Sequence, residues 1–175
     1  DNPLSGHNQA LRDWHDTYGD ELSIALTDTF TTDFFFADFT PEQMTSWKGL
    51  RHDSGDPIDF GNKAIEFYEK NGIDPLEKII VFSDGLDVGE IIRIADYFKD
   101  KINATLGWGT TLTNDLGITP NNFVMKATEV DGVPTVKLSD TPGKHTGPGD
   151  KIREYSEYVK AALAENALNN TLVAV

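Results

Sequence analysis

The sequence contains no cysteine, which excludes disulfide bonds and thiol chemistry from both the fold and the function. It also contains no apolar run long enough to span a bilayer, and no segment with the charged start and apolar centre of a secretory signal. These three absences predict a protein of the reducing cytosol, hence a cytoplasmic location, with no membrane among its partners.

Basic residues are scarce, because 15 Lys and Arg stand against 29 Asp and Glu and leave a net charge of −14. The shortage is greatest in the first 60 residues, whose basic side chains are Arg12, Lys48 and Arg51. A surface of this sign repels the phosphates of nucleic acids and of anionic lipids. We therefore expect no nucleic acid as a partner, and we interpret most of the acidic surplus as solvated surface.

What the sequence does contain is an alternation of short Ile, Val and Leu runs with segments of helical period. Such alternation is typical of parallel strands joined by helical crossovers, and therefore of the α/β class. The length fits one domain or one large piece of a bigger domain. We predict strands at 21–28, 49–55, 78–84 and 102–109, a hairpin over 122–140 around "DG", and helices at 5–18, 62–72, 86–100 and 149–166.

Three helices carry recognisable start, stop or face signals. In the first, Ala10, Leu11, Trp14 and Tyr18 share one stripe, and Gly19 is placed to end the helix. The helix at 86–100 is expected to begin at the N-cap Asp87, with Glu90 three residues later as in a capping box, and Asp150 is expected to cap the last helix.

Polar residues follow four of the predicted strands, in "ALTD", "LRHDSGD", "VFSDG" and "TLGWGTT". The carboxyl ends of parallel strands meet at one edge of a sheet, where α/β proteins carry their ligand sites. Asp28, Asp53 and Asp84 suit sugar hydroxyls or Mg²⁺, which takes oxygen ligands. Arg51 can hold a carboxylate or a phosphate with two parallel hydrogen bonds.

The glycine-rich "GWGTT" stretch is the second part of this candidate site. Gly107 and Gly109 would let backbone N–H groups approach a phosphate, with the hydroxyls of Thr110 and Thr111 as additional donors. A lone GxG also serves as a tight exit from a strand, so the glycines alone do not decide between these readings.

Several separate motifs in one order resemble the C-terminal half of the nicotinate phosphoribosyltransferase family. They are "QALRDW", "IALTDTFTTDFF", "GLRHDSGDP", "KIIVFSDGLD", "GWGTTLTND", "NFVMK" and "KLSDTPGK". The resemblance implies an irregular, TIM-like α/β barrel. It also implies an ATP-coupled transferase or ligase of NAD biosynthesis, which converts nicotinate and phosphoribosyl pyrophosphate into nicotinate mononucleotide and pyrophosphate.

The resemblance also assigns roles to individual residues. Arg51 matches the arginine that meets the nicotinate ring and its carboxylate, and Thr110 matches a contact to the phosphoribosyl donor. Asp28, Asp53 and Asp84 match acidic positions around the ribose and pyrophosphate. The remaining substrate-binding candidates in the same motifs are Ser54, Gly55, Ser83, Gly107, Gly109 and Thr111. Mg²⁺, ATP as co-substrate and a homodimer of the full-length enzyme are implied as well, without assigning the metal ligands.

One family feature is missing from the sequence. The phosphorylated histidine of the family lies in a "GT..AHE" segment just before the "QALRDW" helix, and no such segment stands there. We therefore assign no catalytic residue and expect residues 1–175 to be the C-terminal part of the barrel domain. The N-terminal domain would be absent, and the chain would be inactive by itself.

Alternatives stay open at this point. Arg51 could form a structural ion pair with Asp53 or Asp56 instead of binding a ligand. The chain could belong to a nicotinamide phosphoribosyltransferase, although "RHDSGDP" in place of "RPDSG" favours the nicotinate branch, or it could be a non-catalytic binding or scaffold module.

The four histidines receive structural interpretations. We expect His7 to be a solvated residue ahead of the first helix, and His15 and His145 to lie at the surface. His52 neighbours Arg51 on a strand, and alternation turns the two side chains to opposite faces, so His52 is expected to pack inside.

Overall fold

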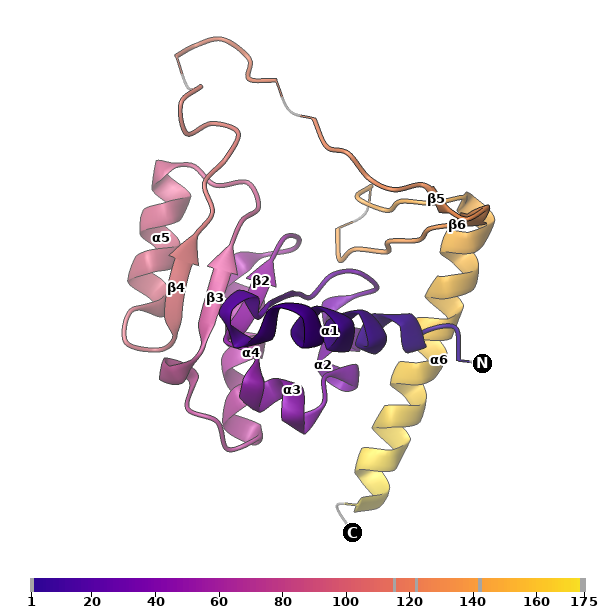
Figure 1. Cartoon of the computed structure of the whole chain (residues 1–175). Coiled ribbons are helices and arrows are strands. Elements are labelled where there is room, and N and C mark those ends of the chain that lie inside the picture. The colour runs from indigo at the N-terminus through magenta and orange to yellow at the C-terminus, as the bar shows by residue number, and fades with distance from the viewer. Residues whose placement is uncertain (1, 115, 122, 142, 174–175) are drawn as a thin grey trace. The chain divides into compact units, whose positions relative to one another are not determined.

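The computed structural model describes residues 2–114, 116–121, 123–141 and 143–173. The chain forms two compact units (Figure 1). We call residues 20–26 and 41–125 the sheet unit, and residues 1–19, 27–40 and 126–175 the helical unit.

The sheet unit is built on four parallel strands in the order β1-β2-β3-β4, so each strand pairs with the next one along the chain. Its elements are β1 (Ile24–Leu26), α3 (Pro41–Ser46), β2 (Gly49–His52), α4 (Pro57–Lys70), β3 (Ile79–Phe82), α5 (Val88–Phe98) and β4 (Asn103–Leu106), with short 3₁₀ turns at Gly19–Leu22 and Pro75–Glu77. The α/β class with a parallel sheet is therefore confirmed. Within the described residues the strands do not close into a barrel.

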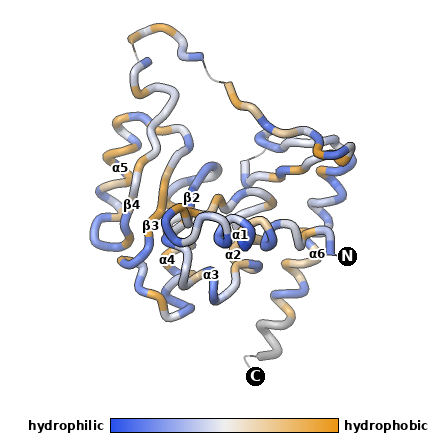
Figure 2. Tube along the Cα trace, viewed as in Figure 1, coloured by the Kyte–Doolittle hydropathy of each residue, from blue (hydrophilic) through white to orange (hydrophobic). Residues whose placement is uncertain are grey.

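The core of the sheet unit lies on one face of the sheet. Leu50, Ile80 and Phe82 point to this face and are fully buried. The Phe82 ring stacks on Phe98 of α5 with centroids 5.2 Å apart, and Phe60 of α4 meets it edge-on at 6.5 Å. Hydrophobic residues accordingly recur along β3 and α5 (Figure 2). Burial of these rings holds both helices against the strands.

Both long helices of this unit begin at aspartate caps. Asp56 accepts from the backbone N–H of Ile58 and Asp59 at the start of α4, and Asp87 accepts from Glu90 N at the start of α5. Such caps satisfy N–H groups that have no partner inside the helix. The Asp87 cap is confirmed. The Glu90 carboxylate, however, bonds to Arg93 on its own helix.

The helical unit contains α1 (Ser5–Tyr18), α2 (Thr32–Asp38), β5 (Glu129–Val130), β6 (Val133–Pro134) and α6 (Gly149–Val173). Its core joins all three chain segments of the unit, through Leu4, Phe30, Phe34, Leu138 and Val159. The 27–40 and 126–175 segments are also joined by a hydrogen bond from Leu138 N to Thr29 O.

The predicted solvated position of His7 is wrong. His7 is 8% exposed, lies among the rings of Phe30, Phe34 and Phe35, and donates through Nδ1 to Asp38 Oδ2 at 2.7 Å. The Asp38 carboxylate at the end of α2 accepts a hydrogen bond from the ring, which compensates for burying its polar N–H group.

The face that α1 buries also differs from the predicted stripe. The buried residues of the helix are His7 and Asn8, and Asn8 donates to the Asp38 carbonyl. Trp14 and Tyr18 are 45% and 49% exposed, and their tilted rings contact each other with centroids 4.5 Å apart. The polar residues are buried because Asp38 offers them hydrogen bonds, which a hydrophobic pattern does not register.

The predicted hairpin is present but much shorter than expected. Its "DG" turn has positive φ at both Asp131 and Gly132, as a type I′ turn requires, and joins the two-residue strands β5 and β6. Residues 123–128 are not in a strand, and Phe123 is 82% exposed. The last helix begins at Gly149, which places Asp150 inside its first turn and not at the cap.

Candidate functional site

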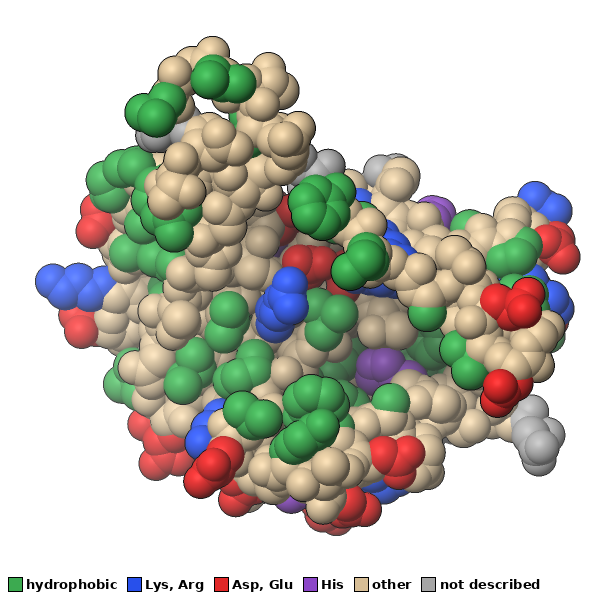
Figure 3. Space-filling model, turned by 45° about the horizontal axis from the view of Figure 1, so that its top comes forward, with side chains coloured by type: hydrophobic (Ala, Val, Ile, Leu, Met, Phe, Trp, Pro, Cys, Tyr) green, Lys and Arg blue, Asp and Glu red, His purple; other side chains and the backbone are tan. Residues whose placement is uncertain are grey.

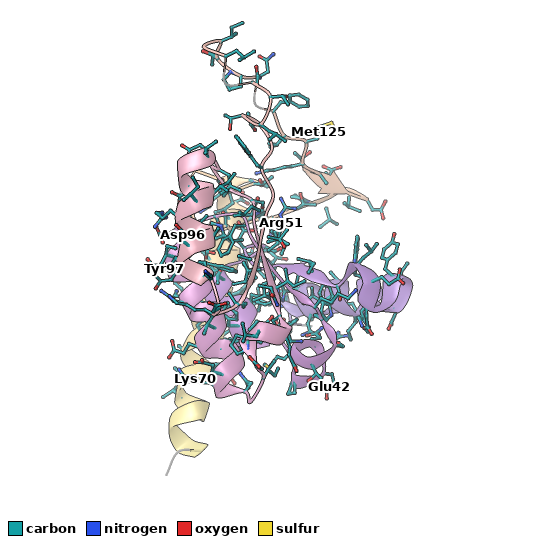
Figure 4. The ribbon with its side chains drawn as sticks, turned by 90° about the vertical axis from the view of Figure 1, so that its left-hand side faces the viewer. Glu42, Arg51, Lys70, Asp96, Tyr97 and Met125 are labelled. Carbon is teal, nitrogen blue, oxygen red and sulfur yellow. The ribbon has the colours of Figure 1, made fainter. Side chains whose placement is uncertain are left out.

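The ends of β2 and β3 bring three of the candidate residues into direct contact. Arg51 Nε donates to Ser83 Oγ at 2.9 Å, and its Nη2 lies 3.2 Å from Asp53 Oδ1. Ser83 Oγ is also 3.4 Å from Asp53 Oδ1. The side chain of Arg51 is 48% exposed and that of Asp53 28%, so this cluster faces solvent. Figure 4 places Arg51 at one end of the sheet, away from Lys70 at the C-terminal end of α4.

The parallel register explains why these residues meet. Arg51 is the partner of Val81 and His52 that of Phe82, so Asp53 and Ser83 are the first residues beyond the ladder. Ser83 continues the ladder by one step, since its N–H donates to His52 O at 3.1 Å and its hydroxyl donates to the same oxygen at 2.9 Å. The expected convergence of strand ends is confirmed for β2 and β3.

The turn after β2 is held from inside the core. His52 is 1% exposed, packs between Phe60 and Phe82, and its Nε2 donates to Gly55 O at 3.1 Å. Gly55 has φ +84°, which glycine adopts without strain. Ser54 is buried in the same turn, and Asp56 then begins α4. The predicted packing role of His52 is confirmed, and the ring fixes the shape of the loop that carries Asp53.

The exit from β4 lies next to that from β3. Gly107 N donates to Phe82 O at 2.8 Å, and a Cβ added to Gly107 would lie 3.2 Å from Ser83 Cβ. A Cβ added to Gly109 would meet nothing within 4 Å, so the chain there borders open space. The two glycines therefore differ, because Gly107 makes room for Ser83 whereas Gly109 leaves its backbone approachable.

The two threonines of "GWGTT" are placed differently. The hydroxyl of Thr111 accepts from Trp108 Nε1 at 2.8 Å and lies 3.2 Å from Leu86 O, to which it donates. Thr111 thus ties the loop to the start of the β3–α5 connection. Thr110 is exposed, and Asp84, directly after Ser83, is half-buried.

Asp28 follows β1 but belongs to the helical unit. It is 1% exposed, forms an ion pair with Lys137 at 2.8 Å, and accepts from Ser139 Oγ at 2.9 Å. No role was assigned to Lys137 or to Ser139 from the sequence. The signal that could have identified both was "KLSD", in which they stand two positions apart.

The pKa values of Asp56, Tyr68 and Lys78 are shifted in the sheet unit, each with a clear physical cause. The backbone N–H of Asp59 is the main cause of a lowered Asp56 pKa, joined by Ile58 N–H and Arg93 and opposed by partial burial. Burial raises the pKa of Tyr68 and lowers that of Lys78. The Lys78 ammonium donates to the carbonyls of Thr45 and Trp47 at 2.9 Å each, which makes it a structural tie below α3.

The described part of the chain has neither a metal-binding cluster nor a membrane-spanning helix. Among the residues that the structure describes, no three His, Asp or Glu side chains are grouped as a metal cage, and no helix is long and apolar enough to cross a bilayer. On the face shown in Figure 3, acidic side chains are spread over the surface and do not form one patch.

Comparison with known families gives one consistent result. Residues 4–171 match the model of the nicotinate phosphoribosyltransferase (NAPRTase) family. The chain is 49% identical over 136 residues to a nicotinate phosphoribosyltransferase of Enterobacter sp. (strain 638), covering 77% of this chain and 34% of that protein. It is 50% identical over 145 residues to that of Edwardsiella ictaluri, covering 81% and 36%. The chain thus spans about a third of the length of these curated relatives.

Solved structures agree with the sequence matches. The crystal structure of nicotinate phosphoribosyltransferase from Porphyromonas gingivalis superposes with a TM-score of 0.83 at 38% identity, over 90% of this chain and 42% of that one. The enzyme from Vibrio cholerae gives the same TM-score at 34% identity, over 92% and 42%.

Proposed function

Because the chain belongs to the nicotinate phosphoribosyltransferase family, we propose that it supplies the strand-end part of such an enzyme's active site. The reaction would join nicotinate to the ribose of phosphoribosyl pyrophosphate, releasing pyrophosphate, in the cytoplasmic synthesis of NAD. The observation that carries the proposal is the contact of Arg51 with Ser83 and Asp53 at the exits of adjacent strands, within motifs that resemble the family.

The proposed role of Arg51 is to bind the carboxylate of nicotinate. A guanidinium matches a carboxylate with two parallel N–H donors, and its charge complements the anion. Half-exposure of the side chain leaves it accessible to a ligand. The ion pair with Asp53 does not compete with this role, because an exposed pair of this kind is weak.

Carboxylates suit the other half of the reaction. Breaking the bond between the anomeric carbon and pyrophosphate builds positive charge on the ribose, and nearby anions stabilise it. Asp53 and Asp84 flank Ser83 in this part of the sheet unit, and the backbone at Gly109 borders open space where a phosphate can approach.

Mg²⁺ belongs to the proposal as a companion of the phosphoribosyl donor. Among the described residues no three carboxylates are grouped so that they could hold a metal ion. The site therefore does not suit an ion held by the protein alone. Mg²⁺ commonly binds through one or two carboxylates plus the phosphates of a substrate. Asp53 or Asp84 would then contact the ion, whose charge would neutralise the leaving pyrophosphate.

A barrel shared with further chain, a homodimer and ATP coupling complete the proposal. The matched relatives are about three times as long, so a complete TIM-like barrel would take strands from outside these residues. ATP coupling through a phosphohistidine would likewise need the segment that the relatives carry before the "QALRDW" helix. We therefore expect the 175 residues alone to form no nicotinate mononucleotide.

A chimera tests this function directly. The matching segment of the Enterobacter sp. enzyme is replaced by this chain, and nicotinate mononucleotide formation is measured with ATP and Mg²⁺. The unaltered Enterobacter enzyme and the isolated chain are the controls. We expect turnover from the chimera and none from the chain, whereas a folded chimera that does not use nicotinate would refute the proposal.

A further inference from the structure

Ser83 has more structural connections than a residue that only binds substrate would need. Its hydroxyl lies 2.9 Å from Arg51 Nε and 2.9 Å from His52 O. A serine hydroxyl has one hydrogen to donate and two lone pairs to accept with. The arginine N–H can only donate and the carbonyl can only accept, so Ser83 accepts from Arg51 and donates to His52. The hydroxyl hydrogen has a second acceptor, Asp53 Oδ1, but that oxygen is 3.4 Å away, so the nearer His52 O is the main acceptor.

His52, to which Ser83 is hydrogen-bonded, is held rigidly in the core. His52 is buried between two aromatic rings, and its imidazole donates to Gly55 O. Ser83 is bound to His52 O through its own N–H as well as through its hydroxyl. The Ser83 oxygen is therefore held by the core and the β-ladder, while Arg51 reaches it with a flexible, half-exposed side chain.

Gly107 contributes the space for this arrangement. A Cβ at Gly107 would lie 3.2 Å from Ser83 Cβ, which is closer than most such contacts, and 3.5 Å from Phe82 O. A side chain at Gly107 would push against the residue that receives the arginine. The absence of a side chain at Gly107, directly after β4, thus keeps Ser83 in place directly after β3.

We propose that Ser83 is a positioning residue that fixes the plane of the Arg51 guanidinium, so that its Nη edge meets a planar carboxylate squarely. The nicotinate part of this inference rests on the proposed function, whereas the orientation of Arg51 does not. Asp53 contacts Nη2 from the side of the neighbouring turn and completes the support. Ser83 then acts on a ligand through Arg51, without binding the ligand itself.

The first experiment examines Arg51 in the 175-residue chain without any ligand. The Nε–H signal of Arg51 is assigned by comparison with Arg51→Lys, and its hydrogen exchange and heteronuclear NOE are measured by NMR. Ser83→Ala should accelerate exchange by about tenfold, the scale of one hydrogen bond to a charged group. Ser83→Thr keeps the hydroxyl and should restore protection, and Thr45→Ala, which loses a hydroxyl on α3 in the same unit, should leave it unchanged.

The second experiment uses the chimera with the Enterobacter sp. enzyme. Ser83→Ala should raise the KM for nicotinate roughly tenfold, since one charge-assisted contact is misaligned, with kcat and the KM for the phosphoribosyl donor changed less than about threefold. Ser83→Thr should recover the nicotinate KM. General damage to the fold would instead lower kcat and raise both KM values together.

The two experiments separate the possible failures. Unchanged exchange of Arg51 Nε–H in a folded Ser83→Ala chain would overturn the positioning role. An altered exchange with an unchanged nicotinate KM would overturn the link between that orientation and nicotinate. A wild-type chimera without nicotinate turnover would refute the proposed function, and the NMR result would still decide what Ser83 does.

Discussion

Two aspartates that follow neighbouring strands form ion pairs of opposite character. Asp28 is 1% exposed and pairs with Lys137 at 2.8 Å, in the helical unit. Asp53 is 28% exposed and pairs with the 48% exposed Arg51 at 3.2 Å, in the sheet unit. Charges removed from water interact strongly and are costly to leave unpaired, whereas exposed charges are screened. The buried pair should therefore govern stability, and the exposed pair is suited to meeting a ligand.

Removal of Lys137 should have the largest effect. Lys137→Ala would leave the Asp28 carboxylate buried without its cation, and losses of this kind cost about 3–5 kcal/mol of unfolding free energy. Urea denaturation followed by circular dichroism measures the change. Lys160→Ala is the matched control, because Lys160 pairs with Glu157 on the surface of α6, and it should cost less than about 0.5 kcal/mol. Equal losses in both variants would contradict the contrast.

Removal of Arg51 should have the second-largest effect, on the use of nicotinate as a substrate. Arg51→Ala in the chimera should weaken the use of nicotinate by roughly 2–4 kcal/mol in kcat/KM, the scale for truncating one partner of a hydrogen-bonded charge pair. Lys70→Ala, at the opposite end of the sheet unit, is the control and should leave kcat/KM unchanged. If Arg51→Ala uses nicotinate as well as the wild type, Arg51 does not bind the substrate. Its ion pair with Asp53 would then be purely structural.

The Asp56 cap should give a smaller effect with a defined pH dependence. Its pKa lies below the ordinary 3.8, chiefly through Asp59 N–H, so its contribution is present above that value and is lost as pH falls through the lower folded-state pKa. Asp56→Ala should cost about 1 kcal/mol at neutral pH. The difference from wild type should shrink below about pH 4, where the carboxylate is neutralised.

Asp56→Asn sharpens the result, since asparagine also caps helices but carries no charge. Thermal unfolding between pH 2 and pH 7 measures all three proteins. A wild-type advantage over Asp56→Ala that grows toward low pH would show that the sign of the shift is wrong.

The smallest expected effect is the change in unfolding free energy when the exposed Arg51–Asp53 pair is removed. Asp53→Ala should change the unfolding free energy by less than about 0.5 kcal/mol, because exposed ion pairs contribute little. Urea denaturation of the isolated chain measures it beside Lys137→Ala. A loss as large as that of Lys137→Ala would remove the distinction between the two pairs.

Local sequence signals predicted the sheet unit well. Alternating apolar runs located the four strands, and the Asp87 and Gly19 signals located one helix start and one helix end. Strand alternation also turned Arg51 outward and His52 inward, as observed. These features depend on neighbours in the sequence, and the consecutive strand order keeps partners close along the chain.

The helical unit was predicted less well because its contacts are distant in sequence. The His7–Asp38 bond spans 31 positions and replaces the apolar stripe expected on α1. The partners of Asp28 lie in the "KLSD" stretch, and the link from Ser139 spans 111 positions. At the end of the sheet unit, the apolar residues at 123–125 have strand propensity, but a strand also needs a neighbour to pair with, and propensity alone does not supply one.

The three-segment construction of the helical unit has a consequence for its synthesis. Asp140 binds Thr32 across 108 positions, and Phe34 of α2 packs against Leu138 and Val159. Ribosomes add roughly 5–20 residues per second, so α2 waits on the order of ten seconds for these partners. The strands β2, β3 and β4 are translated in the interval, each able to pair with its predecessor. We therefore expect the nascent chain to expose the phenylalanines of α2 to chaperones after the sheet unit has begun to fold.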